Sequence, residues 1–367
     1  MEMYMAETRK LQSATSSDII KTVLVVLATL VVVCSGFTLL KANDALPQIV
    51  TTIVAIIWGV SSVILIFYSL NLLAQLFPTK IYNRIVPYIF IGPAVLIMGW
   101  YLFLPTMRSL FLSFMDKTAT NFIGLKNYQY LFTDRSMVVS IRNTIIWLVC
   151  GTGFSVLIGL TVAIMADRSS VGKLAKTLIF LPMSISLVGA GVIFKFMYAA
   201  KFGGSEQIGL LNAIVTSFGL QPQNWLGKAP WNNLFLIAIF VWLQTGFALV
   251  VLSAALNAVP EEMIEAARID GASEIRILLQ IVIPNIRASI ISVSTTILLA
   301  ALKCFDIVYS MTNGMFGTEV LASQQYKQMF TFQNYGRGSA IAILILIGVS
   351  PVIYYNLKEF HNKEAFK

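Results

Sequence analysis

The chain is poor in charged residues, and this scarcity excludes an ordinary water-soluble protein. Only 12% of its 367 residues are Asp, Glu, Lys or Arg, whereas soluble domains carry about 25%. Apolar residues make up 57% of the sequence, against roughly 45–50% in soluble domains. Water is therefore not the main solvent of this chain, and we expect a lipid bilayer to be one of its partners.

Residues that form disulfides or bind metals are also scarce. Cys34, Cys150 and Cys304 each lie in an apolar run without paired spacing, which argues against a disulfide framework and a zinc site. The single histidine, His361, lies in a polar C-terminal segment without a ligand partner at metal-binding spacing. We expect no metal site, and the same scarcity disfavours a membrane enzyme.

The sequence lacks the G-x-x-x-x-G-K-[ST] loop that cradles nucleotide phosphates, so this chain is not predicted to hydrolyse ATP. Its formal net charge is +9, which could suggest nucleic-acid binding if the basic residues shared one soluble face. They lie instead in the connections between apolar runs, where positive charge sets membrane orientation. No nucleic-acid partner is expected.

Long apolar runs are what the sequence has in abundance. A bilayer core about 30 Å thick needs roughly 20 apolar residues in a helix, and runs without alternation are not barrel strands. We therefore predict an all-α, polytopic membrane protein with about eight transmembrane helices. The runs are Ile19 to Leu40, Ile49 to Phe77, Ile85 to Leu112, Val138 to Ala166, Thr177 to Ala200, Asn233 to Val259, Ile290 to Ser310 and Gly338 to Leu357.

The first run and the basic residues together predict the orientation. Ile19 to Leu40 is too long for the core of a signal peptide, which spans about 7–15 residues, so we expect a retained helix. With the N-terminus in the cytoplasm, Lys and Arg are denser on the inner side, as the positive-inside rule requires. Both termini are then cytoplasmic.

Residues 259–289, which we name the coupling segment, form the longest inner connection and have a pattern of their own. Pro260 suits the start of a helix, Gly271 interrupts it, and Ser273 can cap a second helix. Pro284 disfavours continuation of that second helix. The pattern predicts two short helices around a glycine turn, although local features alone also fit an amphipathic helix on the membrane surface.

The order of residues in the coupling segment resembles the EAA loop of binding-protein-dependent ABC importers. Glu265-Ala266-Ala267 is followed by Asp270-Gly271-Ala272 and Ile283-Pro284, and the IDGAS version is similar to that of the carbohydrate-uptake, maltose-type branch. Further segments follow the order of that branch, with the resemblance covering about Ile85 to Leu357. They include Phe122 to Tyr128, Arg142-Asn143-Thr144, Thr312-Asn313-Gly314 and Thr318 to Ala322.

The resemblance implies the architecture and the assembly. Residues 85–357 would form a six-helix type I ABC importer core, residues 1–84 two accessory helices, and residues 358–367 a cytoplasmic tail. The chain would be one permease subunit in the bacterial cytoplasmic membrane and would import a sugar or oligosaccharide by alternating access. Its partners would be a second homologous permease subunit, two ATP-binding-cassette subunits that carry ATP and Mg, and an extracytoplasmic sugar-binding protein.

The resemblance also assigns roles to named residues. The first helix of the coupling segment would dock on an ATPase subunit, through Glu261, Glu262, Glu265, Ala266, Ala267, Asp270, Gly271 and Ala272. The substrate path would follow the helices before and after that segment, through Leu243, Gln244, Phe247, Ile297, Ala301, Lys303, Cys304 and Asp306.

Two features of the substrate path depart from the family pattern or leave alternatives open. Ala301 and Cys304 stand where the maltose permease carries asparagines, so disaccharide binding of that type is not expected. Lys303 and Asp306 are three residues apart and either neutralise one another on one helix face or contact substrate. An acidic sugar attracted by Lys303 is a further alternative.

Other transport functions remain as alternatives. The EAA loop is shared by importers of amino acids and phosphate compounds, whereas the IDGAS, TNG and TEVLA runs favour sugars. A secondary transporter or channel would need internal repeats or a chain of intramembrane acids, and the sequence shows neither.

Overall fold

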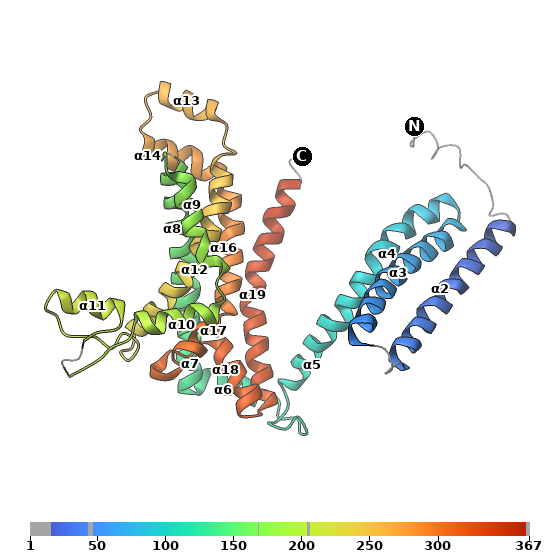
Figure 1. Cartoon of the computed structure of the whole chain (residues 1–367), viewed down its shortest axis with the longest axis horizontal. Helices are drawn as coiled ribbons and strands as arrows, with labels where there is room; N and C mark the ends of the chain where they lie inside the picture. Colours follow the sequence, from blue (N-terminus) through green and yellow to red (C-terminus); the bar gives the residue numbers. More distant parts are fainter. Residues whose placement is uncertain (1–15, 43–46, 168, 204–205, 365–367) are drawn as a thin grey trace. The chain divides into compact units, whose positions relative to one another are not determined.

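The computed structural model describes residues 16–42, 47–167, 169–203 and 206–364, and this described part contains helices and no β-strand. Six helices are long and apolar enough to cross a membrane, or eight if each of two bent helix pairs counts as one span. The predicted all-α fold with about eight spans is therefore confirmed. The chain divides into two compact units, one ending at Met107 and one beginning at Arg108 (Figure 1).

The first unit contains α2 (Ser16–Ala42), α3 (Gln48–Gln75) and α4 (Thr79–Met98). A buried hydrogen bond of 2.8 Å joins Thr29 Oγ1 on α2 to Ser69 Oγ on α3. Between α3 and α4 the rings of Phe67 and Phe90 stack, with centroids 5.8 Å apart. Because most other side chains of these helices are apolar and exposed, the unit suits a hydrocarbon environment.

The boundary between the units falls inside one continuous helical run, Thr79–Leu112. The run comprises α4, the π-helix η1 (Gly99–Phe103) and α5 (Leu104–Leu112). The functional division at residue 85 was predicted from the resemblance and stays a prediction.

The second unit contains the remaining elements in chain order. These are α6 (Lys126–Thr133), α7 (Arg135–Ile146), η2 (Trp147–Gly151), α8 (Thr152–Asp167), α9 (Gly172–Phe180), η3 (Leu181–Ser184), α10 (Leu187–Met197), α11 (Leu210–Ser217), α12 (Trp231–Leu256), α13 (Glu261–Ile269), α14 (Glu274–Ile277), η4 (Leu278–Val282), α15 (Ile283–Asn285), α16 (Arg287–Leu302), α17 (Asp306–Met311), η5 (Met315–Gly317), α18 (Leu321–Tyr326), η6 (Lys327–Thr331) and α19 (Tyr335–Glu364). The last helix extends into the predicted tail.

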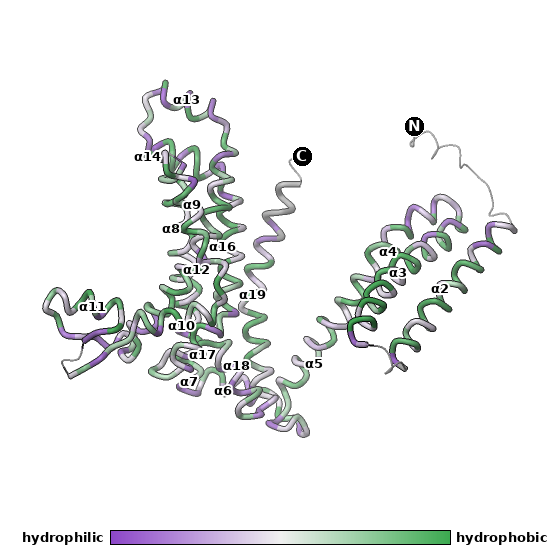
Figure 2. The backbone as a smooth tube through the Cα atoms, in the orientation of Figure 1, coloured by the Kyte–Doolittle hydropathy of each residue, from purple (hydrophilic) through white to green (hydrophobic). Residues whose placement is uncertain are grey.

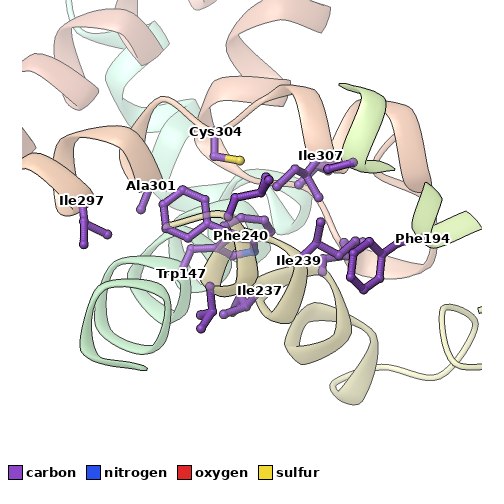
Figure 3. Close-up of a cluster of buried hydrophobic side chains, with 14 of the residues drawn as sticks. Trp147, Phe194, Ile237, Ile239, Phe240, Ile297, Ala301, Cys304 and Ile307 are labelled. Carbon is purple, nitrogen blue, oxygen red and sulfur yellow. The ribbon is translucent and has the colours of Figure 1, made fainter. Parts of the chain in front are cut away.

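Helix α12 is the centre of the second unit, packed by α8, α9 and α16. Small residues permit the close contacts: a Cβ added to Gly159 on α8 would lie 2.5 Å from Ala248 Cβ. The rings of Trp147 and Phe240 meet edge to face in the buried cluster that Figure 3 shows. Close packing of this kind makes α12 a stiff connection between the two ends of the unit.

Two spans are bent. The run predicted as Thr177 to Ala200 turns by 104° between Gly172–Ser184 and Leu187–Met197. Ser186 caps the new helix α10, because its hydroxyl accepts a 3.1 Å hydrogen bond from the Gly189 amide. The second bend, of 70°, separates Glu274–Asn285 from Arg287–Leu302.

The span predicted as Ile290 to Ser310 is not one helix, so this prediction was wrong in detail. Helix α16 ends at Leu302, the residues Lys303 to Phe305 are not helical, and α17 starts at Asp306. The apolar run contains no proline or glycine at this point, and the break follows from packing. Cys304 within the break and Ile307 just after it are buried in the central cluster (Figure 3).

Candidate functional site

Helix α13 and the turn that follows it form the tip of the coupling segment, beyond one end of α12 (Figure 1). The turn is a Schellman motif: the Ala272 amide donates to the Ala267 carbonyl at 3.0 Å, and the Gly271 amide donates to the Arg268 carbonyl at 3.0 Å. Gly271 has φ +78°, and a Cβ there would meet no atom within 4 Å. Glycine is thus required by the backbone conformation and not by lack of space.

A small apolar cluster anchors this turn to the rest of the unit. Its buried members are Val259, Ala267, Ile277, Val282 and Ile286, and Ala272 packs against them. The inner face of α13 is therefore fixed on the helices that follow it. Movement of α13 would be transmitted directly to them.

The second helix of the segment is capped and tied to the first. The Ser273 hydroxyl accepts a hydrogen bond from the Arg276 amide at 3.4 Å, as predicted for a cap. Across the turn, Arg268 Nε lies 2.8 Å from Glu274 Oε1, and this hydrogen bond raises the pKa of Arg268. The helical run of this second helix includes the π-helix η4, continues through Pro284 and ends at Asn285.

Most of the predicted coupling residues are accessible to another protein. Ala267 is buried and Ala272 half-buried, whereas Glu261, Glu262, Glu265, Ala266, Asp270 and Gly271 are exposed. The sequence reasoning missed Ile269, an apolar side chain that is 86% exposed at the end of α13. Hydrophilic residues are concentrated on this segment and apolar ones on the long helices (Figure 2).

A polar cluster, also missed in the sequence, lies where α12 approaches the coupling segment. The Lys176 ammonium pairs with the Asp167 carboxylate and hydrogen-bonds the Ser253 hydroxyl of α12. The same hydroxyl lies 3.2 Å from each Asp167 carboxylate oxygen. These contacts connect α8, α9 and α12 at one end of the unit.

The predicted substrate-path residues separate into two groups. Leu243, Ile297, Ala301 and Cys304 are buried together in the central apolar cluster. Figure 3 labels the last three of them. Gln244 and Phe247 on α12 are half-buried, Lys303 is exposed and Asp306 is half-buried. Only the second group offers side chains to a molecule outside this packed core.

The proposed neutralisation of Lys303 by Asp306 finds no support in the structure. Lys303 is the C-cap of α16 and Asp306 the first residue of α17, so they do not share a helix face. In the described part of the chain, no salt bridge joins them. A substrate role for either residue stays a prediction.

The segment that contains the TNG and TEVLA runs forms an ordered loop at the opposite end of α12. Asn143 on α7 donates from Nδ2 to the carbonyls of Gly317, at 2.7 Å, and Glu319, at 2.8 Å. Asn232 on α12 donates to the Phe316 carbonyl at 2.8 Å. Asn143 and Asn232 thus fix the backbone of this loop to α7 and α12.

A partly buried ion pair completes the loop. The Lys327 ammonium pairs with the Glu319 carboxylate and donates to the Asn313 carbonyl at 2.7 Å. The Ser323 hydroxyl donates to the other carboxylate oxygen of Glu319 at 2.5 Å. The acidic side chain is therefore satisfied within the loop.

The comparisons with known proteins decide the family. Residues 155–365, more than half of the chain, match the family described as binding-protein-dependent transport system inner membrane component. The chain belongs to this family. It is a multi-pass permease subunit of an ABC importer and not itself an enzyme, because members of the family are membrane components of transport systems.

The permease is similar to two curated relatives over most of their length. It is 50% identical to the osmoprotective compounds uptake permease protein GgtC of Synechocystis sp., across 76% of this chain and 100% of the relative. It is 43% identical to the alpha-glucoside transport system permease protein AglF of Rhizobium meliloti, across 85% of this chain and 97% of the relative.

A solved structure supports the fold of the permease. A chain of a bacterial ABC transporter involved in the import of the acidic polysaccharide alginate matches with a TM-score of 0.65 and 20% identity. The match covers 76% of this chain and 99% of that chain.

Proposed function

We propose that this permease imports a neutral glycoside or small oligosaccharide. The observation that carries the substrate class is the 43% identity to an alpha-glucoside permease over 97% of that protein. The burial of Ala301 and Cys304 in an apolar cluster agrees with a site that differs from the maltose type. An amino acid or a phosphate compound is the alternative cargo.

For the assembly, we propose the arrangement that the resemblance implies. The permease pairs with a second homologous permease subunit and receives its cargo from an extracytoplasmic sugar-binding protein. Two ATPase subunits bind ATP and Mg, and one of them contacts α13. In this arrangement the coupling segment and both termini lie in the cytoplasm, and the opposite end of α12 faces outward.

The coupling segment converts ATPase closure into movement of the helices. Its exposed acidic residues and Ile269 offer a mixed polar and apolar surface to the ATPase, and the small cluster around Ala267 fixes that surface to the membrane helices. The Asp167–Lys176–Ser253 contacts hold α8, α9 and α12 together at the same end. The helices therefore rotate as a unit when α13 is displaced.

The accessible members of the predicted path contact the sugar. An amide such as Gln244 bridges hydroxyl groups, and the ring of Phe247 stacks on the C–H face of a sugar. Lys303 and Asp306 add charged hydrogen-bonding groups at the break between α16 and α17. Their opposite charges together suit a neutral polyhydroxyl compound.

The test is transport by the complete complex. The permease, its partner permease, the ATPase and the binding protein are reconstituted in vesicles, and ATP-driven uptake is measured for a panel of α-glucosides, amino acids and phosphate compounds. We expect uptake and ATPase stimulation by at least one α-glucoside. Uptake of only an amino acid or a phosphate compound would replace the sugar assignment.

A further inference from the structure

Four aromatic side chains gather beside the break between α16 and α17. The ring centroid of Phe305, the last residue of the break, lies 4.8 Å from that of Tyr309 on α17 and 4.7 Å from that of Tyr326 on α18. The two tyrosine centroids are 5.7 Å apart, and the Phe330 centroid on η6 is 5.1 Å from that of Tyr326. Rings at these separations are in contact. We name these four residues the aromatic cluster.

The aromatic cluster is open on one side. Tyr309 is 46% exposed and Phe330 is 64% exposed, whereas Phe305 and Tyr326 are half-buried. On α17 the opposite side faces the core, through the buried residues Ile307, Val308 and Met311. The contacts among the four rings therefore leave large parts of Tyr309 and Phe330 uncovered by the described residues.

Hydrogen-bonding groups accompany these rings. Asp306 is half-buried and precedes Tyr309 by three positions on α17, so the two residues share one side of the helix. Lys303 is exposed at the C-cap of α16. The hydroxyls of Tyr309 and Tyr326 make no hydrogen bond in the part of the chain that the structure describes. The open side thus combines aromatic rings with charged and hydroxyl groups.

The position of the aromatic cluster joins the ordered outer loop to the predicted substrate path. At one end, Tyr326 directly precedes Lys327, whose ammonium pairs with Glu319 of that loop. At the other end, Phe305 closes the non-helical break that begins at Lys303. Under the orientation proposed above, a molecule that enters from outside along this side passes the rings on its way to the break.

Two bland roles for the aromatic cluster fit these observations less well. Tyrosines often anchor a protein at the lipid interface, but a carboxylate beside them repels an anionic headgroup, and charged groups at membrane depth normally face protein or water. A contact with another subunit would bury the rings, yet the centre of a protein interface is depleted of charged residues. Both Lys303 and Asp306 flank the rings here. A sugar, which has apolar C–H faces and many hydroxyls, matches both kinds of group.

We propose that the aromatic cluster is a stacking platform that holds a sugar ring of the incoming glycoside at the outer entrance of the predicted substrate path. The proposal rests on the proposed sugar-import function. The rings of Tyr309 and Phe330 contact the C–H face of the sugar. The Asp306 carboxylate accepts hydrogen bonds from sugar hydroxyls, and the Tyr309 hydroxyl exchanges hydrogen bonds with them.

The first test measures ATP-driven uptake of an α-glucoside by the complete complex in vesicles. The loaded binding protein is kept at saturating concentration, so its own affinity for the sugar does not limit the rate. We expect Tyr309→Leu and Phe330→Leu each to lower the uptake rate about threefold to tenfold, because each removes one aromatic stacking surface. Phe330→Tyr keeps the ring and should retain most of the uptake.

Matched controls separate the platform from general damage. Phe332→Leu and Phe218→Leu remove exposed rings, 52% and 79% exposed, that are not members of the aromatic cluster. Both should transport as the wild type does. Unchanged uptake in Tyr309→Leu and Phe330→Leu overturns the platform while the import function stands, whereas a wild-type complex that imports no glycoside refutes that function itself.

The second test asks whether sugar touches the rings. A diazirine-bearing α-glucoside that the wild-type complex imports is photolysed during turnover, and the labelled peptides of the permease are mapped. We expect label on α17 or on α18 and η6, reduced in the leucine variants. Absence of label from these elements shows that the rings act through lipid or packing, and the proposal is then wrong. Loss of the second permease subunit from the leucine variants would equally overturn it, because the rings would then be a subunit contact.

Discussion

The backbone angle φ of Gly271 determines the turn that follows α13 in the coupling segment. Its φ of +78° closes the Schellman turn, and the open space around it leaves conformation as the only constraint. For a residue with a Cβ, the left-handed conformation costs about 1–2 kcal/mol of free energy. Asparagine adopts it more readily than other residues, and β-branched residues adopt it least.

We predict that Gly271→Val lowers ATP-driven uptake at least about tenfold, since a strain above about 1.4 kcal/mol shifts the turn out of its native conformation. Gly271→Asn should retain most of the uptake. Uptake and the content of ATPase subunits are measured in purified complexes with matched expression. Normal uptake by the valine variant would show that α13 does not need this turn.

A second prediction concerns the accessible face of α12. Gln244→Ala removes one or two hydrogen bonds to the sugar, each worth about 0.5–1.5 kcal/mol. Transport should weaken about twofold to tenfold without being abolished, and Phe247→Ala should act in the same direction. The control is Val250→Ala, an exposed position on the same helix. Unchanged uptake kinetics in the Gln244 and Phe247 double variant would remove this helix from the sugar path.

At the scale of elements, local sequence predicted the coupling segment well. Pro260, Gly271 and Ser273 act through their own backbone and immediate neighbours, so their signals are readable without the fold. Ile269 was missed because apolar spacing alone does not tell which side of a short helix is covered.

The break between α16 and α17 could not be read from the sequence in the same way. No proline or glycine interrupts the run around Lys303, and the break depends on packing against distant helices. The Asp167–Lys176–Ser253 contacts equally join residues up to 86 positions apart. Spacing along the chain contains no signal for such contacts.

These contacts give a third prediction. Lys176→Met leaves the Asp167 carboxylate without its ion pair in a site about three-quarters covered by protein, so we expect a loss of stability of about 1–3 kcal/mol. Adding Asp167→Asn should restore part of it, because the uncompensated charge is removed. The midpoint of thermal unfolding of the purified complex measures both. Additive losses in the double variant would show that the two side chains are not coupled.

A fourth prediction addresses the exposed face of α13. Glu265→Lys reverses a charge on the surface proposed to meet the ATPase and should reduce both ATPase retention in a pull-down and uptake. Binding-protein docking should be unchanged. Lys173→Glu, a charge reversal at an exposed position of α9, is the matched control. Full ATPase retention by Glu265→Lys would exclude this contact.

At the scale of the whole molecule, the first helices are predicted to be accessory. About a quarter of this chain has no counterpart in the osmoprotective compounds permease, although that relative is matched over its full length. The structure also refines where a truncation should begin. A cut at residue 84 would remove the first turns of α4, which starts at Thr79.

We therefore predict that deletion of residues 1–78 lowers the stability of the complex more than its transport rate. Thermal unfolding and uptake per assembled complex are measured for the truncated and full-length permease. A truncated complex that assembles normally and neither binds nor imports sugar would assign a transport role to the first helices.

The interruption at Lys303 has an electrical consequence. Helix α16 has 16 residues and spans about 24 Å, less than the roughly 30 Å of a hydrocarbon core. Backbone that is not helical is tolerated at membrane depth only where protein or water surrounds it. Protein covers part of this break, because Cys304 within it is buried. Because one charge crossing 100 mV changes the energy by about 2.3 kcal/mol, we expect uptake to depend on voltage even for a neutral cargo if Lys303 crosses part of the membrane field during transport.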